Sequence, residues 1–208
     1  MIEPAHKLYR FLRACKHALV PLLRGFGYDG RDWYRISLYE DCDRFLAKFD
    51  RDTTRVLAIS SPQHFGELGF KHFTVVQYPE FDICRDVLGQ KFDLIIADQV
   101  FEHVKYPYRA ARNVHAMLAP RGYFLMATPF MVRLHQAPLD CCRWSAEGIR
   151  YFLSECGFDE SKIVSSSWGN RSYIWRHFWG TWWPMRGFFG SLRNEPNFPV
   201  AVWAFAQK

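Results

Sequence analysis

Between residues 92 and 128 the order of apolar and polar positions predicts a strand, a helix and a second strand. Phe92–Ala97 is a short apolar run typical of a buried strand. Residues 107–118 carry apolar side chains at helical spacing, and Ala119–Gly122 is a stop signal that contains Pro and Gly. Tyr123–Ala127 is a second apolar run of strand length. Two strands joined by a crossover helix of this length predict a right-handed parallel unit.

Similar patterns extend this unit in both directions and predict an α/β protein. Further strands are expected at residues 54–60, 73–77, 162–167 and 200–207, with a stunted strand at 81–83. Helices are expected at residues 4–24, at 31–49 and from the N-cap Ser145 to about Cys156, with Gly157 as the stop. The helix at 4–24 is amphipathic and basic, and Pro21 breaks it near Val20.

Polar side chains follow the two strands of the central unit. In parallel sheets, ligands bind beyond the carboxyl ends of the strands. Asp98, Gln99, Glu102 and His103 lie at one such end, and Thr128 lies at the next. A long loop, residues 130–144, then follows, and long loops in compact domains often carry function. Its candidate residues are Arg133, His135, Asp140, Arg143 and Trp144.

The composition adds few constraints to this picture. A chain of 208 residues with 49% hydrophobic and 23% charged residues suggests one globular domain, or two at most. Aromatic residues reach 18% and include eight Trp, a surplus that favours a lined pocket or an interface. The net charge of +6 weakly favours anionic partners. Because no dense basic tract exists, a specific nucleic-acid partner is not indicated.

Cysteine usage and the N-terminal pattern predict a cytoplasmic protein. None of the six Cys forms a CxxC pair or a metal-type spacing, so we expect reduced thiols. Lys7, Arg10, Arg13 and Lys16 interrupt the first apolar runs, and we therefore expect no signal peptide. The sequence has no run of eighteen apolar residues, so no membrane span is expected.

The central unit also resembles a known family. FDLIIADQVFEHV and AARNVHAMLAPRGYFLMATP resemble the second half of class I S-adenosylmethionine-dependent methyltransferases, and are closest to the small-molecule, methyltransferase-11-like group. The resemblance extends more weakly over about residues 53–160. It implies a doubly wound Rossmann-like sheet in residues 51–208, mostly parallel with an antiparallel last strand. It also implies a helical segment at 1–50 that covers the cofactor cleft, and an aromatic-rich insert at about 168–199.

The resemblance implies S-adenosylmethionine as cofactor, although the cofactor loop departs from the family pattern. Ala58 stands where the family often has an acid, the loop at 60–66 is poor in glycine, and Gln77 replaces the acid that binds the ribose. Gln77 can still accept one hydrogen bond and donate others. The residues that the resemblance places at the cofactor are Ile59, Ser60, Ser61, Gln77, Tyr78, Asp82, Asp98 and Gln99.

The resemblance places the loop at 130–144 on the acceptor side, where Arg133, Asp140, Arg143 and Trp144 would bind substrate. A hydroxyl acceptor benefits from a general base, so His135 is the first candidate and His103 the second. QVFEHV also resembles the ExxEH segment of metal-assisted members, with Gln99 in place of the first Glu. Gln is a weaker ligand than Glu, and we expect no metal, with a metal on Glu102 and His103 as the alternative.

These observations predict methyl transfer from S-adenosylmethionine to a small-molecule or saccharide-type acceptor. The alternative is a catalytically inactive methyltransferase-fold protein that serves as a binding or assembly subunit, which Ala58, Gln77 and the missing glycines favour. Residues 4–24 and 168–199 are candidates for a peripheral contact with a membrane or with another protein.

Overall fold

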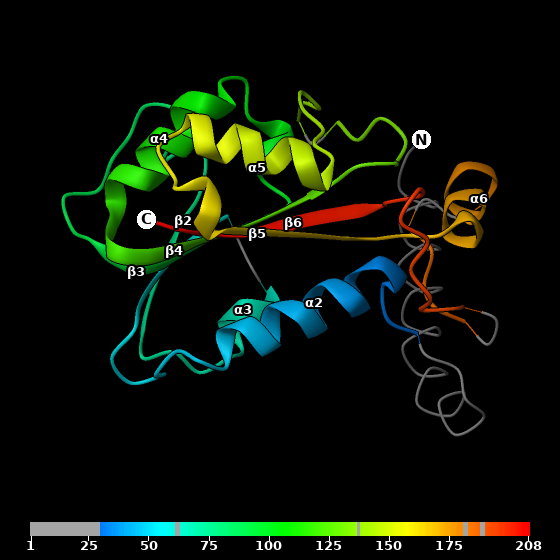
Figure 1. Ribbon diagram of the computed structural model, residues 1–208, viewed down its shortest axis with the longest axis horizontal. Coiled ribbons are helices and arrows are strands. Elements are labelled where there is room, and N and C mark those ends of the chain that lie inside the picture. Colours follow the sequence, from blue (N-terminus) through cyan, green and yellow to red (C-terminus); the bar gives the residue numbers. More distant parts are fainter. Residues whose placement is uncertain (1–29, 61–62, 137, 181–182, 188–189) are drawn as a thin grey trace, which may run out of the picture.

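The computed structural model describes residues 30–60, 63–136, 138–180, 183–187 and 190–208 (Figure 1). The predicted helix at 4–24 and the predicted cofactor residue Ser61 lie outside these ranges. The described chain forms a six-stranded sheet in the order β2-β1-β3-β4-β6-β5. The strands are β1 (Arg55–Ile59), β2 (His72–Val76), β3 (Phe92–Asp98), β4 (Leu118–Pro129), β5 (Ile163–Trp168) and β6 (Ala201–Gln207).

The sheet has the mixed direction that the sequence predicted. Strands β2, β1, β3 and β4 pair in parallel, whereas β6 runs antiparallel to both of its neighbours, β4 and β5. This arrangement confirms the α/β class and the antiparallel last strand. The parallel strands β1 and β3 are almost continuously buried, as expected for strands that are covered on both faces.

Helices cover both faces of the sheet. In Figure 1, α4 (Pro107–Met117) and α5 (Ala146–Glu155) lie on one side, while α2 (Trp33–Leu46) and the short α3 (Gln63–Gly66) lie on the other. The remaining helix α6 (Arg171–Trp179) lies beyond one end of the sheet, and two 3-10 turns, η1 (Phe101–His103) and η2 (Glu160–Lys162), complete the set. Ser145 caps α5 as predicted, because its side chain accepts a hydrogen bond from the Gly148 N–H at 3.0 Å.

The predicted stunted strand at 81–83 is wrong. The chain folds into turns there, with Asp82 at their centre: its carbonyl oxygen accepts hydrogen bonds from the N–H groups of Arg85 and Asp86 at 2.8 and 2.7 Å. Its carboxylate accepts a third from the Cys84 N–H at 2.9 Å. Because residue 82 organises a turn, the connection adds no strand, and β2 remains at the edge of the sheet.

The predicted stop at Ala119–Gly122 lies inside a strand, which is a second correction. Strand β4 begins at Leu118, directly after α4, and its register to β3 shifts between the Phe92↔Leu118 and Leu94↔Tyr123 pairs. Arg121 takes a positive φ of 63° at this bulge. Gly122 is required by space, since a Cβ there would lie 3.0 Å from the carbonyl oxygens of both Ala119 and Phe92. The Pro-Gly signal therefore marks a bulge in a strand.

The core has two layers, one on each face of the sheet. Phe101, Phe124 and Phe152 pack beneath α4 and α5. Trp33, Trp168 and Tyr173 form a second group on the other face, between α2 and α6. No helix in the described part of the chain is long and apolar enough to cross a membrane.

Candidate functional site

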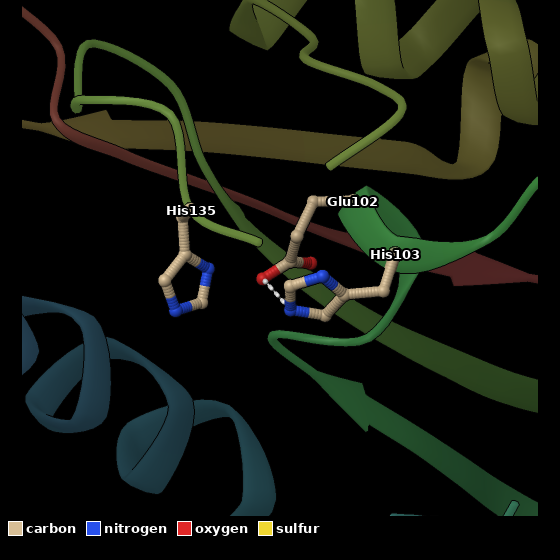
Figure 2. A group of neighbouring side chains, drawn as sticks. All are labelled: Glu102, His103 and His135. Carbon is tan, nitrogen blue, oxygen red and sulfur yellow. Dashed lines mark ion pairs between the residues drawn. The ribbon is translucent and has the colours of Figure 1, made fainter. Parts of the chain in front are cut away.

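The turn that follows β3 brings Glu102 and His103 to the carboxyl edge of the sheet. Strand β3 ends at Asp98, and Gln99 reverses the chain with a positive φ of 56°. The turn η1 is anchored by Phe101, which is fully buried against Phe124 and Phe152. This anchor fixes the direction of the next two side chains, and Figure 2 shows them beside His135, which comes from the loop at 130–144.

The loop at 130–144 is attached to η1 by its backbone. The Cys141 N–H donates to the Glu102 carbonyl oxygen at 2.6 Å, and Nδ1 of His103 is hydrogen-bonded to the Leu139 carbonyl oxygen. Because these bonds join two segments far apart in the sequence, the loop is a structured wall of the site, as its length suggested.

Asp140 and Arg143 stabilise this wall from within. The guanidinium of Arg143 donates to both carboxylate oxygens of Asp140, and the His135 N–H donates to one of them at 2.6 Å. Burial disfavours the charged form of Asp140, but these donors outweigh it and hold the pKa of the carboxyl below its usual value. The two residues predicted to bind substrate are thus engaged with each other, and they position His135.

Glu102, His103 and His135 form a compact group. One potential ligand atom from each lies within 4.8 Å of the others, and the two imidazole rings are 5.0 Å apart. The dashed line in Figure 2 marks the 3.6 Å between Nε2 of His103 and Oε1 of Glu102. The structure therefore brings together the two predicted bases and adds a carboxyl group to them.

Glu102 is an unusual carboxyl group. It is fully buried, and neither of its side-chain oxygens accepts a hydrogen bond from any described residue. Burial raises the pKa of Glu102 to about 8, because the charged form loses its hydration. A buried polar group without partners is costly, and such groups cluster at functional sites.

His135 also keeps an unpartnered atom in this group. Its Nδ1 is buried without a hydrogen bond to the described residues, and the hydroxyl of Thr128, at the end of β4, is in the same condition. Burial and the neighbouring His103 lower the pKa of His135, which favours the neutral imidazole. A neutral imidazole can accept a proton, and two imidazoles with a carboxylate can also ligate a divalent transition metal.

The predicted cofactor residues lie at the ends of β1, β2 and β3. Ile59 ends β1 and is buried, and Ser60 follows it with a positive φ of 72°. The Ser60 N–H donates to the Val76 carbonyl oxygen at 2.8 Å. Gln77 and Tyr78 come directly after β2 with exposed side chains. Asp82 lies in the turn described above, where its carboxylate serves the backbone.

Asp98 is held by α2. Its Oδ2 accepts a hydrogen bond from the Tyr39 hydroxyl at 2.8 Å, and Nη1 of Arg35 lies 3.7 Å from the same oxygen. The ring of Tyr39 stacks on His64 at 4.1 Å. Gln99 reaches the same carboxylate through its amide at 3.4 Å. Helix α2 therefore supplies two polar residues to this edge of the sheet.

Sequence reasoning missed these two residues, Arg35 and Tyr39. Both lie in the helix predicted at residues 31–49, and neither was singled out there. Nothing in the local sequence pairs them with Asp98, which lies 59 positions after Tyr39. Glu102 was noted at the strand end and as an alternative metal ligand, but its burial without a partner is a property of the fold that the sequence does not show.

Two other predicted substrate residues lie outside the group. The Arg133 N–H donates to Nε2 of His177, a buried residue of α6, at 2.9 Å. Trp144 packs on Phe152 of α5 at 4.9 Å between ring centroids. Both residues attach the loop at 130–144 to helices.

Comparison with known proteins identifies relatives at the level of family and fold. A family model described as a methyltransferase domain matches residues 17–183. No curated protein matches the sequence. An S-adenosylmethionine-dependent methyltransferase from Archaeoglobus fulgidus has a similar structure, with a TM-score of 0.53 and 12% identity over 83% of this chain and 94% of that one.

A second similar structure is that of the [4+2]-cyclase SpnF. Its TM-score is 0.52 with 15% identity, over 86% of this chain and 84% of that one. At identities this low, the two structures establish the shared fold alone.

Proposed function

The chain belongs to the methyltransferase domain family, and on this premise we propose that it transfers a methyl group to a small-molecule or saccharide-type acceptor at the carboxyl edge of the sheet. Family membership indicates S-adenosylmethionine as the methyl donor, in agreement with the sequence prediction. The observation that carries the proposal is the group of Glu102, His103 and His135, which presents buried polar atoms without partners in the described chain. Unpartnered atoms of this kind reduce stability, and binding or catalysis explains their presence.

The residues after β1, β2 and β3 suit an adenosine-containing ligand. The side chain of Gln77 is exposed and makes no hydrogen bond to a described residue, so its amide is available to ribose hydroxyls. The Tyr78 ring is 74% exposed and can stack on an adenine. The cofactor, when bound, supplies the electrophilic methyl group and the leaving group. The protein has to position the acceptor and exclude water.

His135 is the proposed general base. Its backbone is fixed by Asp140 and its imidazole favours the neutral form, so it can accept the proton of an acceptor hydroxyl. His103 is the second candidate, but its Nδ1 is already engaged with the Leu139 carbonyl oxygen. We assign His103 to orienting the acceptor, with its Nε2 directed toward Glu102.

A second candidate for acceptor activation is a divalent metal ion on Glu102, His103 and His135. The favouring observation is their spacing, since one ligand atom from each lies within 4.8 Å of the others. A carboxylate and two imidazoles are a common ligand set for Zn²⁺, Mn²⁺ and Fe²⁺. The metal would orient the acceptor and make its hydroxyl more acidic.

Calorimetric titration with S-adenosylmethionine and with S-adenosylhomocysteine tests the proposal. We expect heat of binding and thermal stabilisation, and Gln77→Ala should weaken binding about tenfold because one hydrogen-bonded contact is lost. The matched control is Gln90→Ala, an exposed Gln in the connection between β2 and β3. Absence of heat and of stabilisation at millimolar ligand would overturn the enzymatic proposal in favour of an inactive binding subunit.

The role of His135 is tested separately, by formation of S-adenosylhomocysteine over a panel of hydroxylated acceptors. His135→Ala should spare cofactor binding and reduce turnover about a hundredfold. The protein is then treated with a chelator and titrated with Mn²⁺ or Zn²⁺. This titration distinguishes a general base from a metal ion as the group that activates the acceptor hydroxyl. If His135 is a ligand, His135→Ala abolishes metal binding and added metal restores turnover in wild type alone; if it is a base, turnover is unaffected by chelator.

A further inference from the structure

Helix α6 is amphipathic in the reverse sense to an ordinary surface helix. Its inward face carries the polar-tipped residues Tyr173 and His177, one turn apart, and both are fully buried. Its outward face carries Trp175, Phe178 and Trp179, which are 65%, 44% and 83% exposed. A surface helix normally buries its apolar residues and exposes polar ones, so this apolar face needs an explanation.

The exposed aromatic side chains surround one cavity. It has a volume of about 400 Å³ and is lined by Arg171, Ile174, Trp175, Phe178, Trp179 and Phe198. These residues, which we call the α6 face, come from α6 itself and from the segment that precedes β6. In Figure 1 the helix lies beyond the end of the sheet.

Positive charge borders the α6 face. Arg171 and Arg193 line a neighbouring cavity of about 320 Å³. Arg171 is paired with Glu195 at 2.6 Å, whereas Arg193 is exposed and forms no ion pair with the residues that the structure describes. Arg176 is not part of this border, because its guanidinium lies over the buried ring of Trp33 at 5.1 Å. With a net charge of +6 for the whole chain, this border is complementary to an anionic surface.

We propose that the α6 face binds peripherally to an anionic lipid membrane. Trp combines a large apolar ring with an N–H donor and is therefore favoured at the boundary between lipid headgroups and acyl chains. Short amphipathic helices with aromatic residues and flanking Arg lie in this boundary, where apolar burial and attraction to anionic lipids add together. In this arrangement, Trp175, Phe178 and Trp179 enter the interface and Arg193 contacts lipid phosphates.

The size of the face favours a membrane over a protein partner. Stable protein interfaces use about 20–30 residues on each side. The α6 face offers three strongly exposed apolar side chains on a helix of nine residues. A few aromatic side chains suffice for reversible interfacial binding, because a membrane needs no matching surface of fixed shape.

This inference does not depend on methyl transfer, although it places the membrane near the acceptor side. Nε2 of His177, on the inward face of α6, accepts the hydrogen bond from the Arg133 N–H at 2.9 Å, and Arg133 lies in the acceptor-side loop. Trp183 lies 5.3 Å from the imidazoles of both His177 and His135. The α6 face is therefore connected by direct packing to the group of Glu102, His103 and His135.

Vesicle co-sedimentation of the full chain tests the inference. We expect the wild-type protein to sediment with vesicles of phosphatidylcholine and phosphatidylserine, more weakly with phosphatidylcholine alone, and less at high salt. The double variant Trp175→Ser/Trp179→Ser should weaken binding at least about tenfold, because two interfacial rings are lost. Arg193→Glu should weaken binding to the anionic vesicles only.

The matched control is Tyr151→Ser, which removes a 55% exposed aromatic ring from α5, on a different helix. This variant should bind vesicles as wild type does, and all variants should keep the wild-type melting temperature. Failure of wild type to bind anionic vesicles, or equal binding by the double variant, would overturn the inference. So would a wild-type dimer that the double substitution dissociates, since a second copy would then cover the α6 face.

Discussion

At the scale of single residues, the site depends on how each buried polar atom is satisfied. Asp98 and Asp140 accept hydrogen bonds, from Tyr39 and Arg143 respectively, whereas the carboxyl of Glu102 accepts none in the described chain. The first two carboxylates therefore hold structure, and the third is free for a ligand. All three side chains end in a carboxyl group, and their different surroundings separate their roles.

Removing the Tyr39 hydroxyl tests how firmly α2 is held to Asp98. Tyr39→Phe keeps the ring that stacks on His64 but loses the 2.8 Å hydrogen bond to a nearly buried carboxylate. We expect the free energy of unfolding to fall by about 2 kcal/mol, as measured by urea denaturation. The control Tyr106→Phe removes a hydroxyl from an exposed ring and should leave stability unchanged. Equal effects of the two changes would contradict the role of Tyr39.

At the scale of elements, local sequence determined most helices and strands, and long-range contacts determined the rest. The predicted helices at 31–49 and 145–156 and the predicted strands at 54–60 and 200–207 agree with α2, α5, β1 and β6 to within a few residues. Each is a periodic segment with clear end signals. The error at 81–83 arose because the chain forms turns where a strand was predicted. The error at 119–122 arose because a bulge continues β4 where a stop was predicted.

Gly122 shows why the bulge could not be predicted. Pro and Gly close together ordinarily end an element, but here Gly122 lets β4 pass close to β3. Gly122→Ala would place a Cβ 3.0 Å from two carbonyl oxygens, so the neighbouring backbone must move by a few tenths of an ångström. We expect a loss of about 1–3 kcal/mol in the free energy of unfolding. Gly89→Ala, at a position with nothing within 4 Å of the added carbon, should change it by less than about 0.5 kcal/mol.

The contact between Arg55, at the start of β1, and Asp93, near the start of β3, depends on pH. Asp93 of β3 accepts hydrogen bonds from the Arg55 guanidinium at 2.8 and 2.9 Å and from its backbone N–H at 3.0 Å. The Arg55 side chain is the main cause that lowers the pKa of Asp93. A lowered pKa in the folded state contributes stability above the unfolded value, near 3.8, and this stability is lost as the pH falls below it.

Asp93→Asn should therefore lower the melting temperature more at pH 7 than in acid, because protonation of the wild-type carboxyl as the pH falls removes the same charge. Thermal unfolding monitored by circular dichroism from pH 3 to 7 measures the difference. Asp52→Asn is the matched control, because Asp52 pairs with Lys71 at 3.0 Å through side chains that are both about two-thirds exposed. A wild-type loss of stability in acid that Asp93→Asn leaves unchanged would contradict this assignment.

The candidate site was predicted in its residue types and only partly in its geometry. His103 and His135 were recognised because one follows a parallel strand and the other lies in a long loop, and the fold brings them together. Gln77, Tyr78 and Asp98 were placed at strand ends by the same reasoning. Three features depend on tertiary packing, which sequence spacing does not encode. They are the contacts of α2 with Asp98, the pairing of Asp140 with Arg143 and the burial of Glu102.

At the scale of the whole molecule, one aromatic cluster joins α2, β5 and α6. Trp33, Trp168 and Tyr173 have ring centroids 5.6–6.3 Å apart, and Tyr34 lies 6.1 Å from Tyr173. The cluster attaches α2, which holds Asp98, to α6, which contacts the loop at 130–144. The same cluster packs against the inward side of α6. Its packing therefore determines how rigidly the α6 face is held.

Two buried tyrosines of this cluster differ in one respect, which makes them a matched pair. The Tyr34 hydroxyl accepts a hydrogen bond from Nε of Arg35 at 2.7 Å. The Tyr173 hydroxyl is buried without a hydrogen-bond partner in the described chain. An unsatisfied buried hydroxyl carries a desolvation cost that a satisfied one has recovered.

Tyr173→Phe should therefore raise the free energy of unfolding by about 1 kcal/mol, whereas Tyr34→Phe should lower it by a similar amount. Both substitutions keep the ring and its neighbours, so urea denaturation of the two variants compares hydroxyl groups alone. A loss of stability in Tyr173→Phe would mean that its hydroxyl has a partner, such as a buried water, and that α6 is held by a polar contact. A gain would show that the Tyr173 hydroxyl makes no stabilising polar contact, and that Tyr173 holds α6 against α2 and β5 through its ring.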